Sequence, residues 1–379
     1  MMSDKPAVVF APGLEGVVAT RTRLSSVDGT TGRLLIAGFP VEELADRASF
    51  EEMLYLLWSD ALPDREQLAA LRRDLAARRA LPKVTTDVLA AAAVERVPPM
   101  DVLRMASGTL SLKDGDDRDY ALRLVAALPT IAAAYWRLLQ GRQPVEPDAE
   151  LAHAANYLYM LSNEAPRPEQ TRALETYLNT VVDHGMNAST FAARVIVSTR
   201  SDIVSAVVGA IGALKGPLHG GAPGPALDVV FEIGEAGRAD EYLRAKLDRG
   251  ERLMGFGHRI YKVRDPRADV LGAAAERLYA TGADRALYEL AREVEETALS
   301  LLEEYKPGRN LKTNVEFYTA LLLHGLGLPT ELFTPTFAVG RVGGWTAHCF
   351  EQQALDRLVR PQSEYIGSKK RSWVPLEER

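Results

Sequence analysis

The sequence has a single cysteine, Cys349, among its 379 residues, so no disulfide can form within the chain. A chain without disulfides fits a reducing compartment, and we expect a cytoplasmic protein. The opening stretch MMSDKPAVVF lacks a basic segment followed by a long apolar run, so we expect no secretion signal. Apolar runs such as ALLLHGL are far too short for a membrane span, and we expect no membrane association.

An excess of positive charge is also lacking: the net charge is −6, and the basic residues are scattered among acids. This balance gives no indication of nucleic-acid binding. The histidines show no pair at the spacing of helical metal ligands, and the lone cysteine has no partner in a zinc-type pattern, so we expect no metal site. The six histidines are His153, His184, His219, His258, His324 and His348.

Helical periodicity dominates the chain once the first strands are past. Residues 16–39 alternate in polarity and predict two short strands around a turn at 28–32. Alanine- and leucine-rich segments follow, and turn residues separate them. We therefore predict an all-α fold with a small N-terminal β-hairpin. Among the expected helices are 49–58, 64–79, 85–97, 119–139, 148–162, 167–184, 187–199 and 202–215.

The middle of the chain has shorter, more charged helices than its flanks, which are apolar and rich in small residues. We predict a large helical domain built from 1–221 and 322–379, and a small helical domain at 222–321. A cleft between two such domains is a common ligand site. The glycines of SAVVGAIGALKG allow another helix to approach closely. That helix could belong to the same chain or to a second subunit.

His219 lies in GPLHGGAPGP, where glycine and proline exclude a helix or a central strand. The backbone of such a turn would hold the imidazole firmly, although an incidental surface histidine is the simpler interpretation. A second histidine, His258, follows the glycines of MGFGHRIYKVRDPR. In that stretch Asp265 and Pro266 suit a helix start, which places Arg267 where backbone N–H groups favour anions. Lys262 adds positive charge suited to phosphates.

Four further residues are candidates for a catalytic, binding or structural role. Glu316 is either a carboxylate base or the partner of Thr313 in a capping box. Arg341 lies in an apolar helix and needs an anionic partner, for which an internal salt bridge is the usual choice. His184 is expected at a helix end, and Arg360 at a helix end or in a loop. Together these histidines, arginines and one carboxylate suit a reaction on a small polycarboxylate with a developing oxyanion.

The motifs GALKGPLHGGA, MGFGHRIYK…DPR, NVEFY, GRVGGWTAHCFEQ and RPQSEY occur in the order and spacing of citrate synthases. The chain therefore resembles that family over essentially its whole length. It is similar in length to the short bacterial and archaeal form, which includes 2-methylcitrate synthases. The resemblance implies a two-domain all-helical homodimer that condenses acetyl-CoA with oxaloacetate.

The resemblance also implies roles for particular residues. His219 would stabilise the enol of the thioester, Glu316 would remove the acyl proton, and His258 would polarise the ketone of oxaloacetate. The substrate carboxylates would be held by His184, Arg267, Arg341 and Arg360, with Arg360 reaching in from a second subunit. The coenzyme A site would be lined by Arg252, Leu253, Met254, Gly255, Phe256 and Lys262. Acetyl-CoA or propionyl-CoA would be a co-substrate, and no cofactor would be bound permanently.

Two alternatives remain open beside the synthesis of citrate. One is a 2-methylcitrate synthase that uses propionyl-CoA. The other is a weakly active or non-catalytic protein that binds CoA esters, because most of the family has aspartate where this chain has Glu316. One added methylene moves the carboxylate by about 1.5 Å, and a misplacement of about 1 Å can lower a rate roughly 100-fold.

Overall fold

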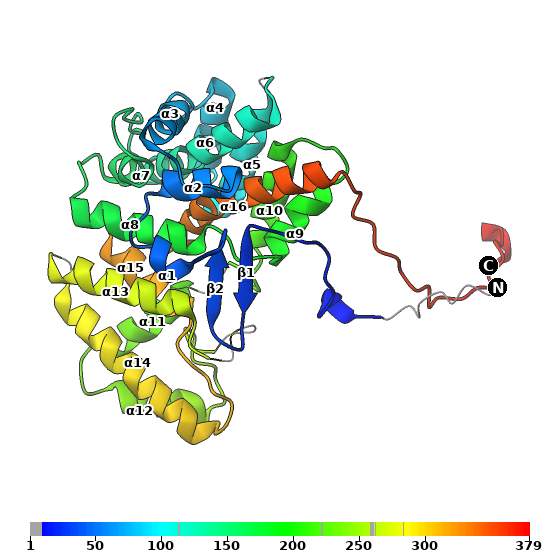
Figure 1. Cartoon of the computed structure of the whole chain (residues 1–379). Helices are drawn as coiled ribbons and strands as arrows, with labels where there is room; N and C mark the ends of the chain where they lie inside the picture. Colours follow the sequence, from blue (N-terminus) through cyan, green and yellow to red (C-terminus); the bar gives the residue numbers. More distant parts are fainter. Residues whose placement is uncertain (1–9, 113, 221–222, 258–260, 262, 283) are drawn as a thin grey trace.

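The computed structural model describes residues 10–379 apart from 113, 221–222, 258–260, 262 and 283. Within these residues the chain forms sixteen α-helices and one three-stranded antiparallel sheet, so the all-α prediction is confirmed. Figure 1 shows the helices in one body from which the C-terminal segment runs away.

The strands form the order β1–β2–β3 and are β1 (Ser25–Asp28), β2 (Arg33–Ile36) and β3 (Phe39–Pro40). The helices before residue 200 are α1 (Val41–Leu44), α2 (Phe50–Ser59), α3 (Arg65–Ala76), α4 (Lys83–Val94), α5 (Pro99–Gly108), α6 (Asp117–Leu139), α7 (His153–Ser162), α8 (Pro168–Val181) and α9 (Ala188–Val197). The helices after it are α10 (Ile203–Leu214), α11 (Pro223–Ile233), α12 (Ala239–Asp248), α13 (Pro266–Ala280), α14 (Arg285–Tyr305), α15 (Val315–Gly325) and α16 (Phe333–Leu355). Short 3-10 helices are η1 (Pro12–Leu14), η2 (Thr109–Leu112), η3 (Thr330–Leu332) and η4 (Leu376–Glu378).

The predicted hairpin is present, with Ser25 paired to Ile36 and Asp28 to Arg33. Asp28 closes its turn by accepting hydrogen bonds from the backbone N–H groups of Thr30 and Thr31. Gly32 adopts a φ of +68°, and a Cβ there would come 2.7 Å from Val263 Cγ2. The tip of the hairpin therefore rests against the segment that precedes α13.

Local capping signals fix several helix starts. Ser49 and Glu52 form a reciprocal capping box at α2, and Asp64 and Gln67 form another at α3. At α13 the Asp265 side chain accepts from the backbone N–H of Arg267, and Pro266 occupies the first position. The predicted helix start at Asp265 is confirmed.

The helix α6 is long and apolar enough to cross a membrane by length and composition, which the sequence reading missed. However, 78% of its most apolar 18-residue window is buried inside the fold. Its neighbours include α4, α5, α7, α10 and α16. The apolar surface of α6 is therefore used for packing within the protein core.

Several predicted helices have different limits in the structure: those expected at 64–79 and 85–97 end three residues earlier, and two others change more for the site. The helix expected at 148–162 begins only at His153, because the Arg79 guanidinium donates to the backbone carbonyls of Asp148 and Leu151 and holds that stretch in another path. The helix expected at 167–184 ends at Val181. His184 therefore lies in the connection to α9 and not at a helix end.

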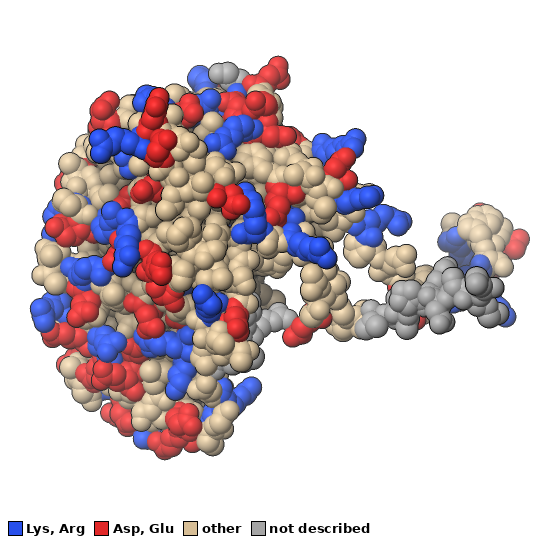
Figure 2. Space-filling view, viewed as in Figure 1, with Lys and Arg blue, Asp and Glu red and all other residues tan. Residues whose placement is uncertain are grey.

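The helix α16 runs through the centre of the fold and contacts α2, α6, α8, α9 and α10. The helices α11, α12, α13 and α14 gather together at one end of the molecule, beside the sheet (Figure 1). The division at 221 and 321 into a large and a small domain stays a prediction. Figure 2 shows basic and acidic side chains interspersed over the visible face.

The glycine-spaced helix is α10, and Gly209 faces α9. A Cβ at Gly209 would come 2.2 Å from Ile196 Cδ1, so the glycine leaves room for the Ile196 side chain between two helices of one chain. An additional role of α10 at a subunit interface stays a prediction.

Candidate active site

His219 lies on a hydrogen-bonded turn just after α10. Its backbone N–H donates to the carbonyl of Gly216 at 2.9 Å, and Pro217 prevents the helix from continuing. The imidazole Nε2 lies 2.8 Å from Ser189 Oγ at the start of α9. The turn therefore holds the backbone of His219, and a side chain from another element holds its ring.

Ser189 is completely buried and has three polar neighbours. Its hydroxyl accepts from Trp345 Nε1 at 3.0 Å and lies 2.8 Å from both Asn187 Oδ1 and His219 Nε2. The hydroxyl has one proton, so it donates either to Asn187 Oδ1, with His219 Nε2 then donating to it, or to His219 Nε2. When it donates to His219, the neutral ring carries its own proton on Nδ1 and can give that hydrogen bond to a ligand.

The protonation state of His219 follows from its surroundings. Burial, and then the positive charge of Arg341, lower the pKa of His219 to about 4. The imidazole is therefore neutral near pH 7. A neutral imidazole can stabilise an enol by hydrogen bonding without transferring a full charge to it.

Glu316 is the second residue of α15, and its carboxylate is not used to cap that helix. Asn314 is the N-cap and accepts from the Glu316 backbone N–H at 3.0 Å, while the Thr313 hydroxyl donates to Glu295 at 2.6 Å. The capping-box alternative for Thr313 and Glu316 is therefore wrong. Among the described residues, no side chain or backbone group forms a hydrogen bond with the Glu316 carboxylate.

The environment of Glu316 favours proton exchange near neutral pH. Burial raises its pKa to about 7, the nearby Arg267 guanidinium opposes the rise, and Asp265 adds to it. A carboxylate with a pKa near the working pH is suited to act as a general base.

Arg267 lies in the first turn of α13 and is buried, with 4% of its surface exposed. The Asp265 carboxylate accepts from its Nε at 3.0 Å and from its Nη2 at 2.8 Å. Burial acts to lower the pKa of Arg267, but the Asp265 charge outweighs it and the pKa is raised. Arg267 is thus a fixed, permanently charged group and not a solvated surface arginine.

Arg341 is buried on α16 and has no carboxylate partner among the described residues. Its Nε donates to the carbonyl of Val181 at 2.5 Å, and its guanidinium lies 4.7 Å from the centre of the Phe337 ring. Burial lowers its pKa to about 10, Asp183 opposes this shift, and Arg267 adds to it. The usual internal salt bridge is absent from the described part of the chain, which leaves a buried cation suited to an anionic ligand.

His184 lies in the connection between α8 and α9. Its Nε2 is 3.1 Å from Tyr261 Oη, and the Arg267 guanidinium lies 5.8 Å from the centre of the Tyr261 ring. Tyr261 therefore joins His184 to Arg267 across two distant parts of the sequence.

Electrostatic effects connect these groups further. Arg341 acts on the pKa of His219, Arg267 acts on those of Arg341 and Glu316, and Glu316 raises that of the buried Tyr177 after burial itself. The structure thus brings His184, His219, Arg267, Glu316 and Arg341 into one neighbourhood. Their roles there stay predictions.

The candidate coenzyme A segment is paired with the start of α15. The carbonyl of Gly255 accepts from Asn314 N–H at 3.0 Å, and Gly257 N–H donates to the carbonyl of Lys312 at 2.7 Å. Phe256 forms an isolated bridge with Thr313. Leu253 is buried, Met254 is half-buried and Arg252 is exposed. Because of this pairing, the segment lies beside the helix that carries Glu316.

Three predicted residues are not placed at the site. His258 and Lys262 lie outside the described residues. Arg360 is exposed on the segment that follows α16, and that segment runs away from the helical body (Figure 1). One copy of the chain therefore does not bring Arg360 to the other groups.

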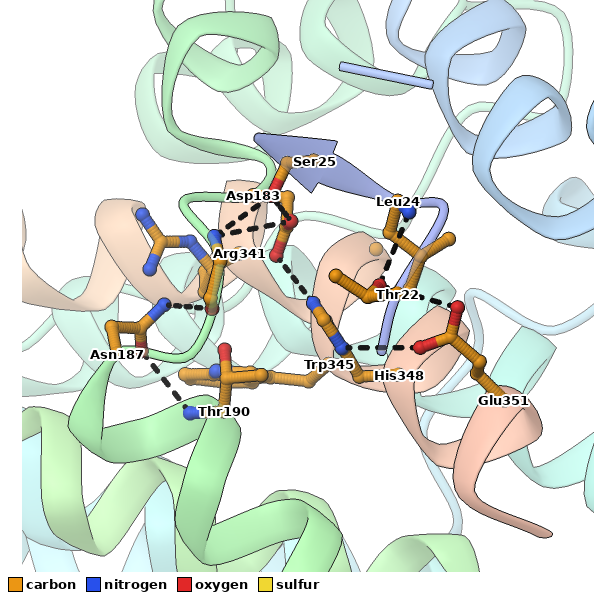
Figure 3. Close-up of polar contacts among 12 residues, drawn as sticks. Thr22, Leu24, Ser25, Asp183, Asn187, Thr190, Arg341, Trp345, His348 and Glu351 are labelled. Carbon is orange, nitrogen blue, oxygen red and sulfur yellow. Dashed lines mark hydrogen bonds and ion pairs between the residues drawn. The ribbon is translucent and has the colours of Figure 1, made fainter. Parts of the chain in front are cut away.

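The sequence reading gave no role to several residues that support the site. Ser189 contacts His219, Trp345 donates to Ser189, and Tyr261 contacts His184. Asp183 and His348 form a buried pair behind them, partly visible in Figure 3. In the sequence, His348 is only a polar side chain within an otherwise apolar stretch, and such a pattern does not identify a partner more than a hundred residues away. Within the described ranges no group of three or more potential metal ligands gathers.

The fold is helical with a small sheet, and two arginines, two histidines and a carboxylate lie in one largely buried neighbourhood. The family model "Citrate synthase, C-terminal domain" matches residues 13–362, and the chain belongs to the citrate synthase family.

The relatives cover nearly the whole chain. Citrate synthase 2 of Bacillus subtilis is 42% identical over 375 residues, which is 97% of this chain and 98% of that protein. A 2-methylcitrate synthase of Mycobacterium tuberculosis is 39% identical, over 95% of this chain and 91% of that protein. The solved ternary complex of carboxymethyl coenzyme A and oxaloacetate with citrate synthase from Thermoplasma acidophilum is 29% identical, with a TM-score of 0.87, covering 98% of this chain and all of that chain (100%).

Proposed function

We propose that this protein condenses acetyl-CoA with oxaloacetate and water to give citrate and CoA. The observation that carries the proposal is a set of electrostatically connected groups: a neutral His219, a Glu316 carboxyl with a pKa of about 7, and a buried Arg341 with no carboxylate partner in the described residues. These groups suit removal of a carbon-bound proton beside an oxyanion, in the presence of a substrate carboxylate.

The reaction would proceed in three steps. Glu316 takes a proton from the acyl methyl group while His219 donates a hydrogen bond to the thioester oxygen, so the enolate forms with its oxygen held by that hydrogen bond. The enolate carbon bonds to the ketone carbon of oxaloacetate as the carbonyl π bond breaks, and His258 gives a proton to the resulting alkoxide oxygen. Solvent restores the proton of His258 and takes the proton held by Glu316. Water then adds to the thioester, and CoA leaves as the thiol.

Substrate binding is assigned to the positive side chains around this centre. His184, Arg267 and Arg341 would hold the carboxylates of oxaloacetate, and Arg360 of a second copy would complete the set. The coenzyme A would lie along 252–256 and against Lys262. The pairing of that segment with the start of α15 supports this arrangement, because it puts the segment beside the helix that carries Glu316.

The active form would be a homodimer in the cytoplasm, with a small domain at 222–321 that closes on the large one. Closure would exclude water while the enol exists. Solution scattering with and without oxaloacetate and a CoA analogue tests this motion. An unchanged profile would contradict it.

The decisive experiment measures CoA thiol release with oxaloacetate and either acetyl-CoA or propionyl-CoA. Proton abstraction is tested separately by solvent deuterium exchange into the acyl group. Glu316→Ala should abolish this exchange. In Glu316→Asp the carboxylate is retained but withdrawn by about 1.5 Å, so we expect a kcat roughly 100-fold lower. Normal exchange in Glu316→Ala would show that another group is the base.

A 2-methylcitrate synthase is the second candidate, and the 39% identical mycobacterial relative favours it. A single methylene changes the binding free energy by only about 1–3 kcal/mol, so one site could accept both acyl chains. The ratio of kcat/KM for propionyl-CoA and acetyl-CoA decides between the two. Release of CoA from neither ester would favour a non-catalytic binding protein.

A further inference from the structure

Behind the candidate site, a chain of buried hydrogen bonds runs from β1 to α16. Asp183 is its centre: it is completely buried and is the residue before His184. Figure 3 shows the Asp183 carboxylate between Ser25 and His348, with the Arg341 guanidinium turned away from it. The carboxylate thus lies near the site without facing it.

Both oxygens of Asp183 are occupied. Oδ2 accepts from Ser25 Oγ at 2.5 Å and from the backbone N–H of Gly185 at 3.4 Å. Oδ1 accepts from His348 Nε2 at 3.1 Å. Burial alone would raise the pKa of Asp183, but His348 and then Ser25 outweigh this and lower it. Asp183 is therefore an anion whose charge is directed at α16 and β1.

The direction of the bond between His348 and Asp183 is fixed from the other side of the ring. Arg194 Nη1 lies 2.8 Å from His348 Nδ1, and a guanidinium can only donate, so Nδ1 must accept. The ring proton is then on Nε2 and points at Asp183. Glu351 holds Arg194 in place by accepting from the same Nη1 at 2.6 Å.

A close approach of backbones makes this contact possible. A Cβ on Gly344 would come 2.2 Å from the carbonyl oxygen of Val182 and 2.9 Å from Asp183 Oδ1. Only glycine at this point of α16 lets the connection that carries Asp183 and His184 lie directly on the helix.

Arg341 lies on α16 close to this arrangement but is left without a carboxylate. Of the acidic residues, Asp183 has the largest effect on the pKa of Arg341, which it raises, yet no carboxylate of the described residues forms an ion pair with this guanidinium. The internal residues outside the described part (113, 221–222, 258–260, 262 and 283) include no aspartate or glutamate. If Asp183 were free to turn, the buried arginine would be its natural partner.

We propose that His348 is a positioning residue for binding of the substrate carboxylate. By donating to Asp183, it keeps that carboxylate from pairing with Arg341, so the Arg341 guanidinium remains available to oxaloacetate. This inference rests on the proposed function, because it takes the ligand of Arg341 to be an oxaloacetate carboxylate.

The test compares His348→Ala with His348→Gln, which keeps an N–H donor near Nε2, and with the double variant His348→Ala/Asp183→Asn. In His348→Ala, the released Asp183 should pair with Arg341 and raise the KM and Kd for oxaloacetate about tenfold or more, with kcat at saturation changing much less. His348→Gln should stay near the wild type. The double variant should recover oxaloacetate affinity, because a neutral amide cannot compete for the arginine as a carboxylate does.

The crystal structure of His348→Ala gives a second measurement, since Asp183 should there lie within ion-pair distance of Arg341. The proposal is overturned if a folded His348→Ala protein binds oxaloacetate normally, if the double variant is no better than His348→Ala, or if kcat falls while KM is unchanged. If His348→Ala does not fold, His348→Gln and Asp183→Asn carry the comparison, and weak oxaloacetate binding by Asp183→Asn would overturn it.

Calorimetric binding of oxaloacetate separates this proposal from the proposed function. A wild-type protein that binds oxaloacetate but releases CoA from neither ester refutes the condensation reaction. Oxaloacetate binding by the His348 variants then still tests the positioning role of His348. A wild-type protein that does not bind oxaloacetate refutes the role of His348 as well.

Discussion

At the scale of single residues, the titration of Glu316 should govern how activity depends on pH. Its pKa of about 7 means that the carboxyl is largely protonated below neutrality, and a protonated carboxyl cannot accept the acyl proton. We expect kcat/KM for the acyl-CoA to fall about tenfold for each pH unit below about 7. Initial rates between pH 5 and 9 measure this profile.

Glu175 offers a matched control for this profile, since burial raises its pKa to about 7 as well, with Arg172 opposing the rise. It lies on α8 and has no place in the proposed chemistry. Glu175→Gln should therefore leave the acidic limb of the profile where it is. If the acidic limb shifts in Glu175→Gln, the titration belongs to Glu175 and not to Glu316.

At the scale of secondary-structure elements, Glu295 of α14 connects two parts of the site. Its buried carboxylate accepts from Arg264 Nη1 at 2.9 Å and from Thr313 Oγ1 at 2.6 Å. Arg264 lies just before α13, and Thr313 lies just before α15. Tyr318 and Arg292 donate to its other oxygen. The starts of the helices that carry Arg267 and Glu316 are thus held by one side chain.

Replacing Glu295 with glutamine should be costly for this reason. The amide has one acceptor oxygen for four donors, and the arginines lose their counter-charge. We expect Glu295→Gln to lower the free energy of unfolding by about 3 kcal/mol and to reduce kcat as the two helix starts loosen. Urea unfolding followed by circular dichroism measures the first effect. The exposed neighbour Glu296, paired with Arg292 at 3.3 Å, is the control, and Glu296→Gln should change stability by no more than about 0.5 kcal/mol.

The limits of the helices and the hairpin also show which features the local sequence predicts. The hairpin turn at Asp28, the helix start at Asp265–Pro266 and most helix spans could be predicted, because each depends on residues within one or two turns. The helix start at 148 and the Thr313–Glu316 capping box could not. In both cases a distant side chain, Arg79 or Glu295, takes the backbone carbonyls or the hydroxyl that the local pattern needed.

At the scale of the whole molecule, the exposed position of Arg360 predicts that the site is completed between two copies of the chain. We expect Arg360→Ala and Glu316→Ala to be nearly inactive when produced separately. When they are co-expressed, a mixed dimer has one site with both residues intact, so activity should return to about a quarter of the wild-type value.

The outcome depends on which chain supplies Arg360. If it acted within its own subunit, every site in a mixed dimer would lack one of the two residues, and co-expression would restore nothing. Arg371, an exposed arginine on the same segment, is the matched control, and Arg371→Ala alone should keep full activity.

The sequence by itself determined the all-α class, the hairpin, most helices and the family, because these depend on periodicity, local capping and motif order. Only the tertiary structure decided that Arg341 has no carboxylate partner in the described chain, that Ser189 reaches His219, and that His348 occupies Asp183. Each of these depends on which side chains meet across 30 to more than 150 residues of sequence. Such meetings are set by the packing of whole helices, and no local pattern encodes them.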